Sequence, residues 1–268
     1  MNAVLRTVGD ASVVAQRNMI KIKRVPDLLI FASLSPIMFV LLFAYVFGSS
    51  IEVPGIDYRE FLIAGIFAQT ILFSSVITGM GLAEDIQKGL IDRLRSLPMS
   101  RSAVLIGRTS SDLAYNLLIL MVMAVTGLIV GWRIRTGFEE AVAGFALLLA
   151  FAYAVSWIMA TVGLAVQQPE VVNNAAGMLA FPLSFIANTF VPSENLPGPL
   201  RVFAEWNPVS AVTQATRELF GNTSPTSAAA LSDAWPMQNA LLASLLWIAL
   251  ILAVFVPLSI RQYRKAIG

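Results

Sequence analysis

The chain has 268 residues, of which 57% are hydrophobic and 13% charged, with a net charge of +2 and a mean hydropathy of +0.76. Soluble domains contain about 45–50% apolar and about 25% charged residues, so this composition predicts an integral membrane protein, all-α in class. The sequence contains neither Cys nor His. Disulfides, thiolate nucleophiles and the commonest metal ligands are thereby excluded, and we expect no metal site. The charge does not suggest a nucleic-acid partner.

The first 27 residues carry five cations and no short apolar core followed by a small-residue cleavage site, so we expect no cleaved signal. Their apolar residues recur at helical spacing from Val4 to Ile22, and the cations lie mostly on other faces. This pattern predicts a helix lying in the headgroup region of a membrane. A disordered basic arm is the alternative.

Six apolar runs are candidates to cross about 30 Å of hydrocarbon as helices. They cover residues 28–47, 61–82, 104–130, 141–166, 175–191 and 240–260. The fifth is shorter and contains Pro182. We therefore expect a single domain over residues 1–268, with an interfacial helix (1–27), a six-span bundle (28–260) and a tail (261–268).

The positions of the cations predict the orientation of the spans. With the N-terminus in the cytoplasm, thirteen of the 18 Lys and Arg residues fall in inside segments, as the positive-inside rule requires. Both termini are then cytoplasmic, and so is segment 84–98. Arg133 and Arg135, in a predicted outside loop, run against this trend.

Segment 84–98 is short and densely charged, and it lies between two apolar spans. Its apolar residues recur at three- and four-residue steps from Ile86 to Leu97, with charges on the opposite face, and Pro98 ends the pattern. We expect a cytoplasmic helix that another subunit can grip, so that movement of that subunit tilts the attached spans. A solvated loop anchored among the headgroups is the alternative.

The region after the fifth span is turn-rich over residues 191–200. Two short amphipathic helices are predicted next, over residues 200–206 and 209–220, the second following Asn207-Pro208. Each is too short to span, so we expect a re-entrant or interfacial hairpin at the outer leaflet.

Several stretches of the chain carry a family resemblance. They are Tyr45-Val-Phe-Gly48, residues 78–85, residues 89–101, Gly107-Arg-Thr109 with Asp112, Phe190-Val-Pro192, Leu196-Pro197 and residues 207–219. In this order, over nearly the whole chain, they resemble the membrane subunit of type-2 ABC exporters, in particular the daunorubicin-resistance (DrrB-like) permeases.

The resemblance implies six spans, a coupling helix after the second span and an outer re-entrant hairpin. It also implies a dimer, with a second copy or a similar chain, bound to two copies of a separate ABC ATPase in a bacterial plasma membrane. The chain has no Gly-x-x-x-x-Gly-Lys-Ser/Thr phosphate loop. ATP and Mg would therefore be bound by the partner ATPase, and this chain would hold no cofactor and would not itself be an enzyme.

Two sets of site residues are predicted. The expected ATPase-coupling residues are Glu84, Asp85, Asp92, Arg93 and Arg95. The expected substrate-pathway residues are Phe181, Phe185, Asn188, Phe190 and Gln69. Aromatic and amide groups together suit an amphipathic ligand. Ordinary helix packing is the alternative for the second set, with Asn188 bonding to a neighbouring helix.

Arg108 and Asp112 stand four residues apart at the cytoplasmic entry to the third span. They can form an ion pair on one helix face, which lowers the cost of an acid near lipid. A proton relay is the alternative reading.

The function predicted from these features is export of a hydrophobic or amphipathic compound, a drug-like molecule or a lipid, from the cytoplasm or inner leaflet. Export of a lipid-linked glycan is an alternative. An intramembrane lipid-modifying enzyme is another, but no group of Asp, Glu, Ser or Lys in the spans has a spacing suited to acid–base or nucleophilic chemistry. A channel would need a filter-like motif or a ring of charges, and neither is visible.

Overall fold

The computed structural model describes residues 27–48, 50–51, 53–89, 103–166, 168–226 and 232–267. Every regular element in these ranges is a helix, so the all-α prediction is confirmed for them. The predicted interfacial helix falls almost entirely on residues 1–26, outside the described ranges. Residues 90–98 of the predicted coupling helix also lie outside them.

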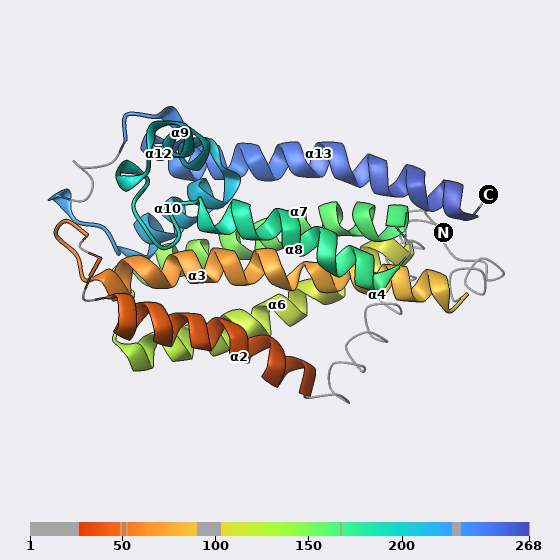
Figure 1. Cartoon of the computed structure of the whole chain (residues 1–268), viewed down its shortest axis with the longest axis horizontal. Helices are drawn as coiled ribbons and strands as arrows, with labels where there is room; N and C mark the ends of the chain where they lie inside the picture. The colour runs from red at the N-terminus through yellow and green to blue at the C-terminus, as the bar shows by residue number, and fades with distance from the viewer. Residues whose placement is uncertain are drawn as a thin grey trace.

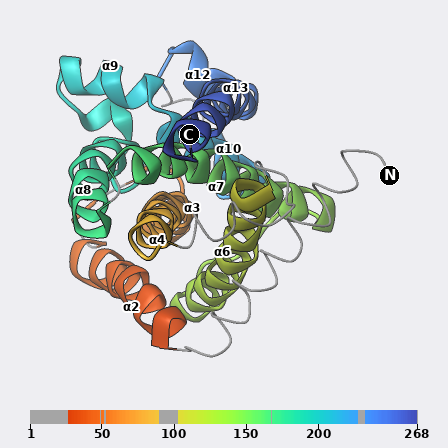
Figure 2. The ribbon, with the colours of Figure 1, turned by 90° about the vertical axis from the view of Figure 1, so that its right-hand side faces the viewer.

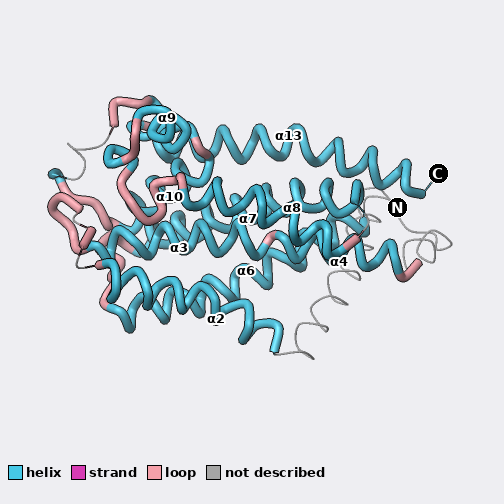
Figure 3. The backbone as a smooth tube through the Cα atoms, viewed as in Figure 1, coloured by secondary structure: helices cyan, strands magenta, loops and turns pink. Residues whose placement is uncertain are grey.

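The helices form one elongated bundle (Figure 1). In chain order they are α2 (Asp27–Leu41), the π-helix η1 (Leu42–Phe47), α3 (Tyr58–Ser74), α4 (Val76–Gln87), α6 (Ala103–Val130), α7 (Phe138–Val166), α8 (Pro169–Phe185), the 3₁₀ turn η2 (Ser193–Asn195), α9 (Gly198–Trp206), α10 (Pro208–Phe220), α12 (Trp235–Gln238) and α13 (Ala240–Ile267). The long helices run along the bundle, and α9, α10 and α12 gather at one end (Figures 1 and 3).

The second predicted span forms the centre of the bundle. Seen along its length, α3 and α4 are surrounded by α2, α6, α7 and α8 (Figure 2). Nearly all of α3 is buried, whereas α13 exposes a row of leucines from Leu241 to Leu258. An apolar helix exposed on one side fits a lipid-facing position, and one buried all round is a core helix.

Within the described residues, four helices are long and apolar enough to cross a membrane. They are Tyr58–Gln87, Leu105–Val130, Phe138–Val166 and Ala240–Tyr263. The first has 30 residues and extends about 45 Å at about 1.5 Å per residue. Ser33–Phe47 is a shorter apolar helix within the first predicted span. The predicted count of six spans is therefore reached only if this shorter helix and α8 also cross the membrane.

The predicted bounds of the fifth span are wrong. α8 begins at Pro169, has 17 residues and ends at Phe185, whereas the prediction ran from 175 to 191. Polar side chains at the start of α10 bind the backbone near this helix end. Asn207 Nδ2 donates to the carbonyl of Leu183 at 2.7 Å, and the backbone amide of Asn188 donates to Ser210 Oγ at 3.0 Å. A helix of 17 residues extends only about 25 Å, so it stops short of a full crossing.

The predicted start of the coupling helix is also wrong. α4 continues through Gln87, so Glu84 and Asp85 lie in the last helical part of the second span and do not begin a new helix. Gly89 follows at φ +63°. An α-helix cannot continue through that left-handed conformation, so 84–98 is not one continuous helix.

The two short helices predicted after the fifth span are present. α9 covers Gly198–Trp206 and α10 covers Pro208–Phe220, each within two residues of the prediction. Asn207 caps α10 by accepting from the amide of Val209 at 2.9 Å. α10 packs against α3, α7 and α13 and is largely buried, so it closes this end of the bundle.

Candidate functional site

A cavity of about 250 Å³ lies inside the bundle, between α2, α3, α4, α6 and α8. It is lined by Ser35, Pro36, Phe39, Gln69, Thr70, Phe73, Ser74, Ile77, Ile119 and Phe181. Three of these side chains are phenylalanine rings, and the polar ones are uncharged. An aromatic cavity with a few neutral polar groups suits a mainly apolar ligand.

Two polar groups in this cavity lining have no hydrogen-bond partner. Gln69 is 3% exposed, yet its Nε2 bonds to nothing, and the same is true of Thr70 Oγ1. Leaving a buried donor without a partner costs about 1–3 kcal/mol. A ligand with an acceptor group would remove that cost.

The cavity adjoins a wider groove of about 620 Å³. The two share Phe73 and Phe181, whose rings make an edge-on contact with centroids 4.9 Å apart. The groove continues along α8 to Asn173 and Asn174, and it includes Met178, which is 81% exposed. An apolar compound could therefore reach the cavity from the exposed side of α8.

The second span is interrupted beside the cavity, between α3 and α4. Ser74 and Ser75 both donate their hydroxyls to the carbonyl of Ile71, at 3.0 and 2.8 Å. Hydroxyls that bond back to the preceding turn bend a helix. Ser74 also bonds to Asn116 of α6, so the break is held from a second helix.

The predicted pathway residues fall in three places. Gln69 and Phe181 line the central cavity. Phe185 and Phe190 form an aromatic cluster with Phe39 and Phe43, with ring centroids 4.2–6.2 Å apart. This cluster adjoins the cavity, because Phe39 lines the cavity and Phe185 stacks on Phe181 with centroids 5.8 Å apart. The structure separates Asn188 from them.

Asn188 lies beyond the end of α8 and lines a different cavity, beside α10. The sequence prediction placed it on one helix with Phe181. Because α8 ends at Phe185, helical periodicity no longer relates the two residues.

Cavity residues that the sequence analysis did not single out include Phe39, Thr70 and Phe73. They come together because α2 and α8 pack against α3 from distant parts of the chain. One signal was available: Pro36 lies inside α2 and Pro182 inside α8, and both line the cavity or its groove. Prolines within membrane helices often mark ligand sites, because they free backbone groups.

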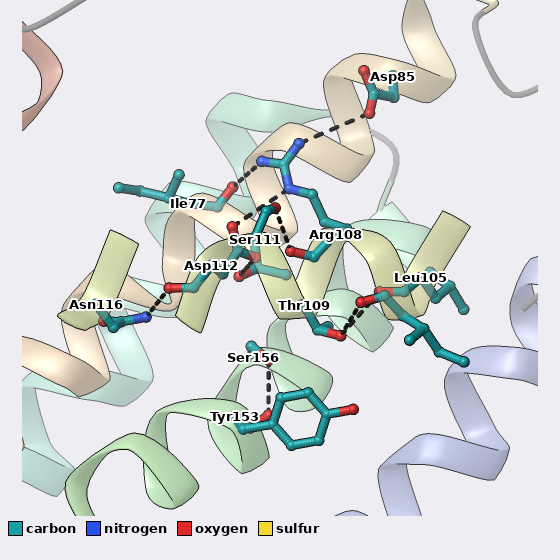
Figure 4. Close-up of polar contacts among 12 residues, drawn as sticks. Ile77, Asp85, Leu105, Arg108, Thr109, Ser111, Asp112, Asn116, Tyr153 and Ser156 are labelled. Atoms are coloured by element: carbon teal, nitrogen blue, oxygen red, sulfur yellow. Dashed lines mark hydrogen bonds and ion pairs between the residues drawn. The ribbon is translucent and has the colours of Figure 1, made fainter. Parts of the chain in front are cut away.

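An ion-pair network centred on Arg108 of α6 extends along α4 (Figure 4). Its guanidinium lies 3.9 Å from Asp85 and 3.7 Å from Asp112, and it donates to the carbonyl of Ile77 at 3.1 Å. Thr78 donates to Asp112 at 2.5 Å. One side chain thus joins α4 to α6, the two helices that flank the segment 90–102.

The guanidinium of Arg108 lies directly over Gly81. A Cβ at position 81 would meet the guanidinium at 1.8–2.6 Å, so only glycine leaves the space. The network therefore depends on a small residue in α4 as well as on charge.

The predicted coupling residues are placed only in part. Asp85 faces Arg108 within the protein, whereas Glu84 pairs with the exposed Lys88 at 3.1 Å. Asp92, Arg93 and Arg95 lie outside the described residues. In the part of the chain that the structure describes, no group of three or more carboxylates is placed to hold a metal ion.

A model of the ABC-2 type transporter family matches residues 10–221. The chain belongs to this family. Similar proteins include the daunorubicin resistance ABC transporter permease DrrB1 of Streptomyces coeruleorubidus, 34% identical over 93% of this chain and 84% of that protein. The probable doxorubicin resistance ABC transporter permease DrrC of Mycobacterium tuberculosis is 27% identical, over 86% and 79% of the two chains. The putative transport permease ycf38 of Porphyra purpurea is 21% identical, over 81% and 75%.

Membership of the family agrees with the apolar helices of the bundle. This ABC-2 protein is a membrane permease, and its helices are consistent with several membrane crossings. The central cavity and the Arg108 network are therefore features of an ABC transporter permease.

Proposed function

We propose that this ABC-2 permease is the membrane subunit of an ATP-driven exporter, which moves a hydrophobic or amphipathic compound out of the cytoplasm or inner leaflet. The observation that carries the proposal is the central cavity, with its aromatic walls and the unpartnered amide of Gln69. Together with the adjoining groove, the cavity offers the volume of a drug-sized ligand, about 300–1,000 Å³.

The chemistry of the cavity lining supports the proposed substrate class. No charged side chain lines the cavity among the described residues, so an ion or a sugar would lose its hydration there without compensation. A largely apolar molecule with one acceptor group would bury its surface and satisfy Gln69. The names of two relatives, which refer to daunorubicin and doxorubicin resistance, agree with a drug-like substrate.

The proposal requires a partner that hydrolyses ATP. The chain lacks a phosphate loop, so we propose that two ABC ATPase subunits bind ATP and Mg and dock near segment 84–98. A second permease chain, identical or similar, would complete the transporter. Phe181 and Phe185 of α8 are 51% and 42% exposed, and they provide apolar surface for contact with that second chain.

We expect co-expression with the ATPase encoded nearest to this gene to give a stable complex. In inverted membrane vesicles, that complex should accumulate a fluorescent, uncharged amphipathic compound when ATP is added. A partner ATPase whose phosphate-loop Lys is replaced by Ala is the control, and it should abolish uptake while the complex still forms. Uptake by the permease alone, or none by the complete complex, would reject the proposed function.

We also propose that both termini and the α4 end of the bundle are cytoplasmic. The helices support this arrangement, because α4, α8 and α13 have their Gln87, Pro169 and Ile267 ends together, opposite α9 and α10 (Figure 1). The positive-inside distribution then puts α9 and α10 on the outer side.

Single-cysteine labelling tests this orientation, and the natural chain contributes no cysteine of its own. A Cys replacing the exposed Thr226 should react with an impermeant maleimide in intact cells. A Cys replacing the exposed Lys88 should react only after permeabilisation. The opposite pattern would invert the proposed topology.

A further inference from the structure

A second cavity, of about 50 Å³, lies at the α10 end of the bundle, away from the proposed transport cavity. It is lined by residues from α3, α10 and the segments that follow α8 and α10, among them Arg217, Asn188 and Glu194. About 10–15 Å³ of such space holds one water molecule, so roughly three or four waters, or one phosphate-sized group, fit here.

Arg217 is the charged group of this cavity, and it is 1% exposed. Its Nε donates to the carbonyl of Phe61 at 2.9 Å. Its Nη2 donates to the carbonyls of Asn188 and Thr189, at 2.7 and 3.3 Å. These bonds have a structural role, because they satisfy the main chain where α8 has ended early.

The third nitrogen of Arg217 has no such role. Nη1 is buried and has no hydrogen-bond partner, and no carboxylate of the described residues lies within ion-pair distance of the guanidinium. Burial lowers the pKa of Arg217 to about 9, so the side chain remains charged near neutral pH. Glu194 lies beyond ion-pair distance and stabilises this charge only at longer range, so an anion in the adjacent cavity would offset more of the cost of burial.

Two more side chains limit which kind of anion fits the cavity. Asn188 Oδ1 is also buried without a partner, which leaves an acceptor beside the cation. Glu194 lines the same cavity and is held by the amide of Ser232 at 3.0 Å. A bound group that carries both a negative charge and a nearby N–H donor satisfies all three side chains.

The cavity continues into a groove of about 640 Å³. The two share Val53, Ile56 and Glu194, and the groove extends to Ile51 and Gly48. Gly48 directly follows η1, whose Tyr45, Val46 and Phe47 are exposed apolar side chains. The groove is lined by apolar Ile51, Val53 and Ile56 and by polar Tyr58, Glu194 and Asn195, and it leads from the charged cavity to the exposed apolar side chains of η1. A charged end with an apolar surface beside it suits a phospholipid.

We propose that this cavity binds the phosphate of a phospholipid at Arg217, with an ammonium group of the headgroup at Glu194 and the acyl chains along the groove. The site is separate from the transport cavity and does not depend on the proposed function. Phosphatidylethanolamine carries both charges and N–H donors, so it is the expected ligand. Phosphatidylcholine lacks the donors, and phosphatidylglycerol lacks the cation.

The test is native mass spectrometry of the full-length chain after reconstitution with equal amounts of these three lipids. The wild type should retain phosphatidylethanolamine in preference to the other two. Arg217→Gln should lower its retention at least tenfold. Arg133→Gln removes an exposed cation that lines neither the cavity nor its groove, and whose Nη1 donates to the carbonyls of Leu128 and Trp132, so it should change nothing.

Glu194→Gln keeps every hydrogen bond that Arg217 donates to the main chain, so it remains informative if Arg217→Gln fails to fold. It should reduce the preference for phosphatidylethanolamine over phosphatidylglycerol several-fold. Equal retention of all three lipids by the wild type, or an unchanged preference in Glu194→Gln, would overturn the proposal. So would binding of inorganic phosphate at Arg217 without retained lipid, which would identify the ligand as the free ion.

Discussion

Replacing Arg108 with Gln should uncouple ATP hydrolysis from transport in the complete exporter. We expect transport to fall at least tenfold while ATPase activity stays within about twofold of wild type. The reason is that Arg108 of α6 holds α4 through Asp85 and the carbonyl of Ile77, next to the segment expected to contact the ATPase. Without the cation, movement of that segment would no longer be passed to both helices together.

Gly81→Ala tests the same contact without changing a charge. Its Cβ would occupy the position of the Arg108 guanidinium and displace it. We expect the same uncoupling. Transport by the Gly81→Ala, Arg108→Gln double variant should be no lower than by either single variant, because both substitutions remove the same interaction. ATPase and transport rates from the same reconstituted preparation are the measurement.

Arg133→Gln is the control for Arg108. It also removes an arginine, but an exposed one that follows the far end of α6, away from segment 84–98, and whose Nη1 donates to the carbonyls of Leu128 and Trp132 at 2.6 and 2.7 Å. Surface substitutions of this kind change little, so transport should be unchanged. If Arg108→Gln lowers ATPase and transport in proportion, or lowers neither, Arg108 has no coupling role.

Gln69→Leu should reduce transport by about tenfold and leave the protein as stable as before, or slightly more so. The side-chain Nε2 has no partner in the structure, so leucine removes a buried unsatisfied donor and nothing in the fold is lost. One hydrogen bond to substrate in a buried site is worth about 1–1.5 kcal/mol, close to a factor of ten. Thermal unfolding and initial transport rates measure the two effects separately.

Thr161→Val should show the reverse pattern. Thr161 is buried between α7 and α13, where it bonds to Ser259 at 2.7 Å and lies away from the cavity. Its replacement should lower stability by about 1 kcal/mol and leave transport per folded molecule unchanged. A Gln69→Leu protein that loses stability and retains full transport would assign Gln69 to packing and not to substrate.

The long helices could be predicted from sequence because their signal is local. Residues 103–130 and 138–166 are largely apolar, and the helices observed there begin within three residues of the predicted starts. The hairpin helices were predictable for the same reason, since Asn207, Pro208 and Gly221 mark their ends. Each of these signals lies within a few residues of the element that it specifies.

The two wrong boundaries have non-local causes. α8 ends at Phe185, where Asn207 binds the carbonyl of Leu183 and Ser210 of α10 binds the backbone amide of Asn188 just beyond the helix, although the apolar pattern continues to Val191. Glu84 and Asp85 read as the start of a new helix because they are the first charges after a long apolar run. In the structure α4 simply continues, with Arg108 of α6 beside Asp85.

The sequence by itself determined that this protein is a helical membrane permease with a charged segment after the second apolar run and two short helices after the fifth. Hydrophobic length and charge placement are local quantities, so they require no knowledge of packing. Only the tertiary structure decided that Gln69 and Phe181 share a cavity, that Asp85 faces Arg108 and that Arg217 has one free nitrogen. Those relations join helices far apart in the chain, and the distances between them depend on how the helices pack.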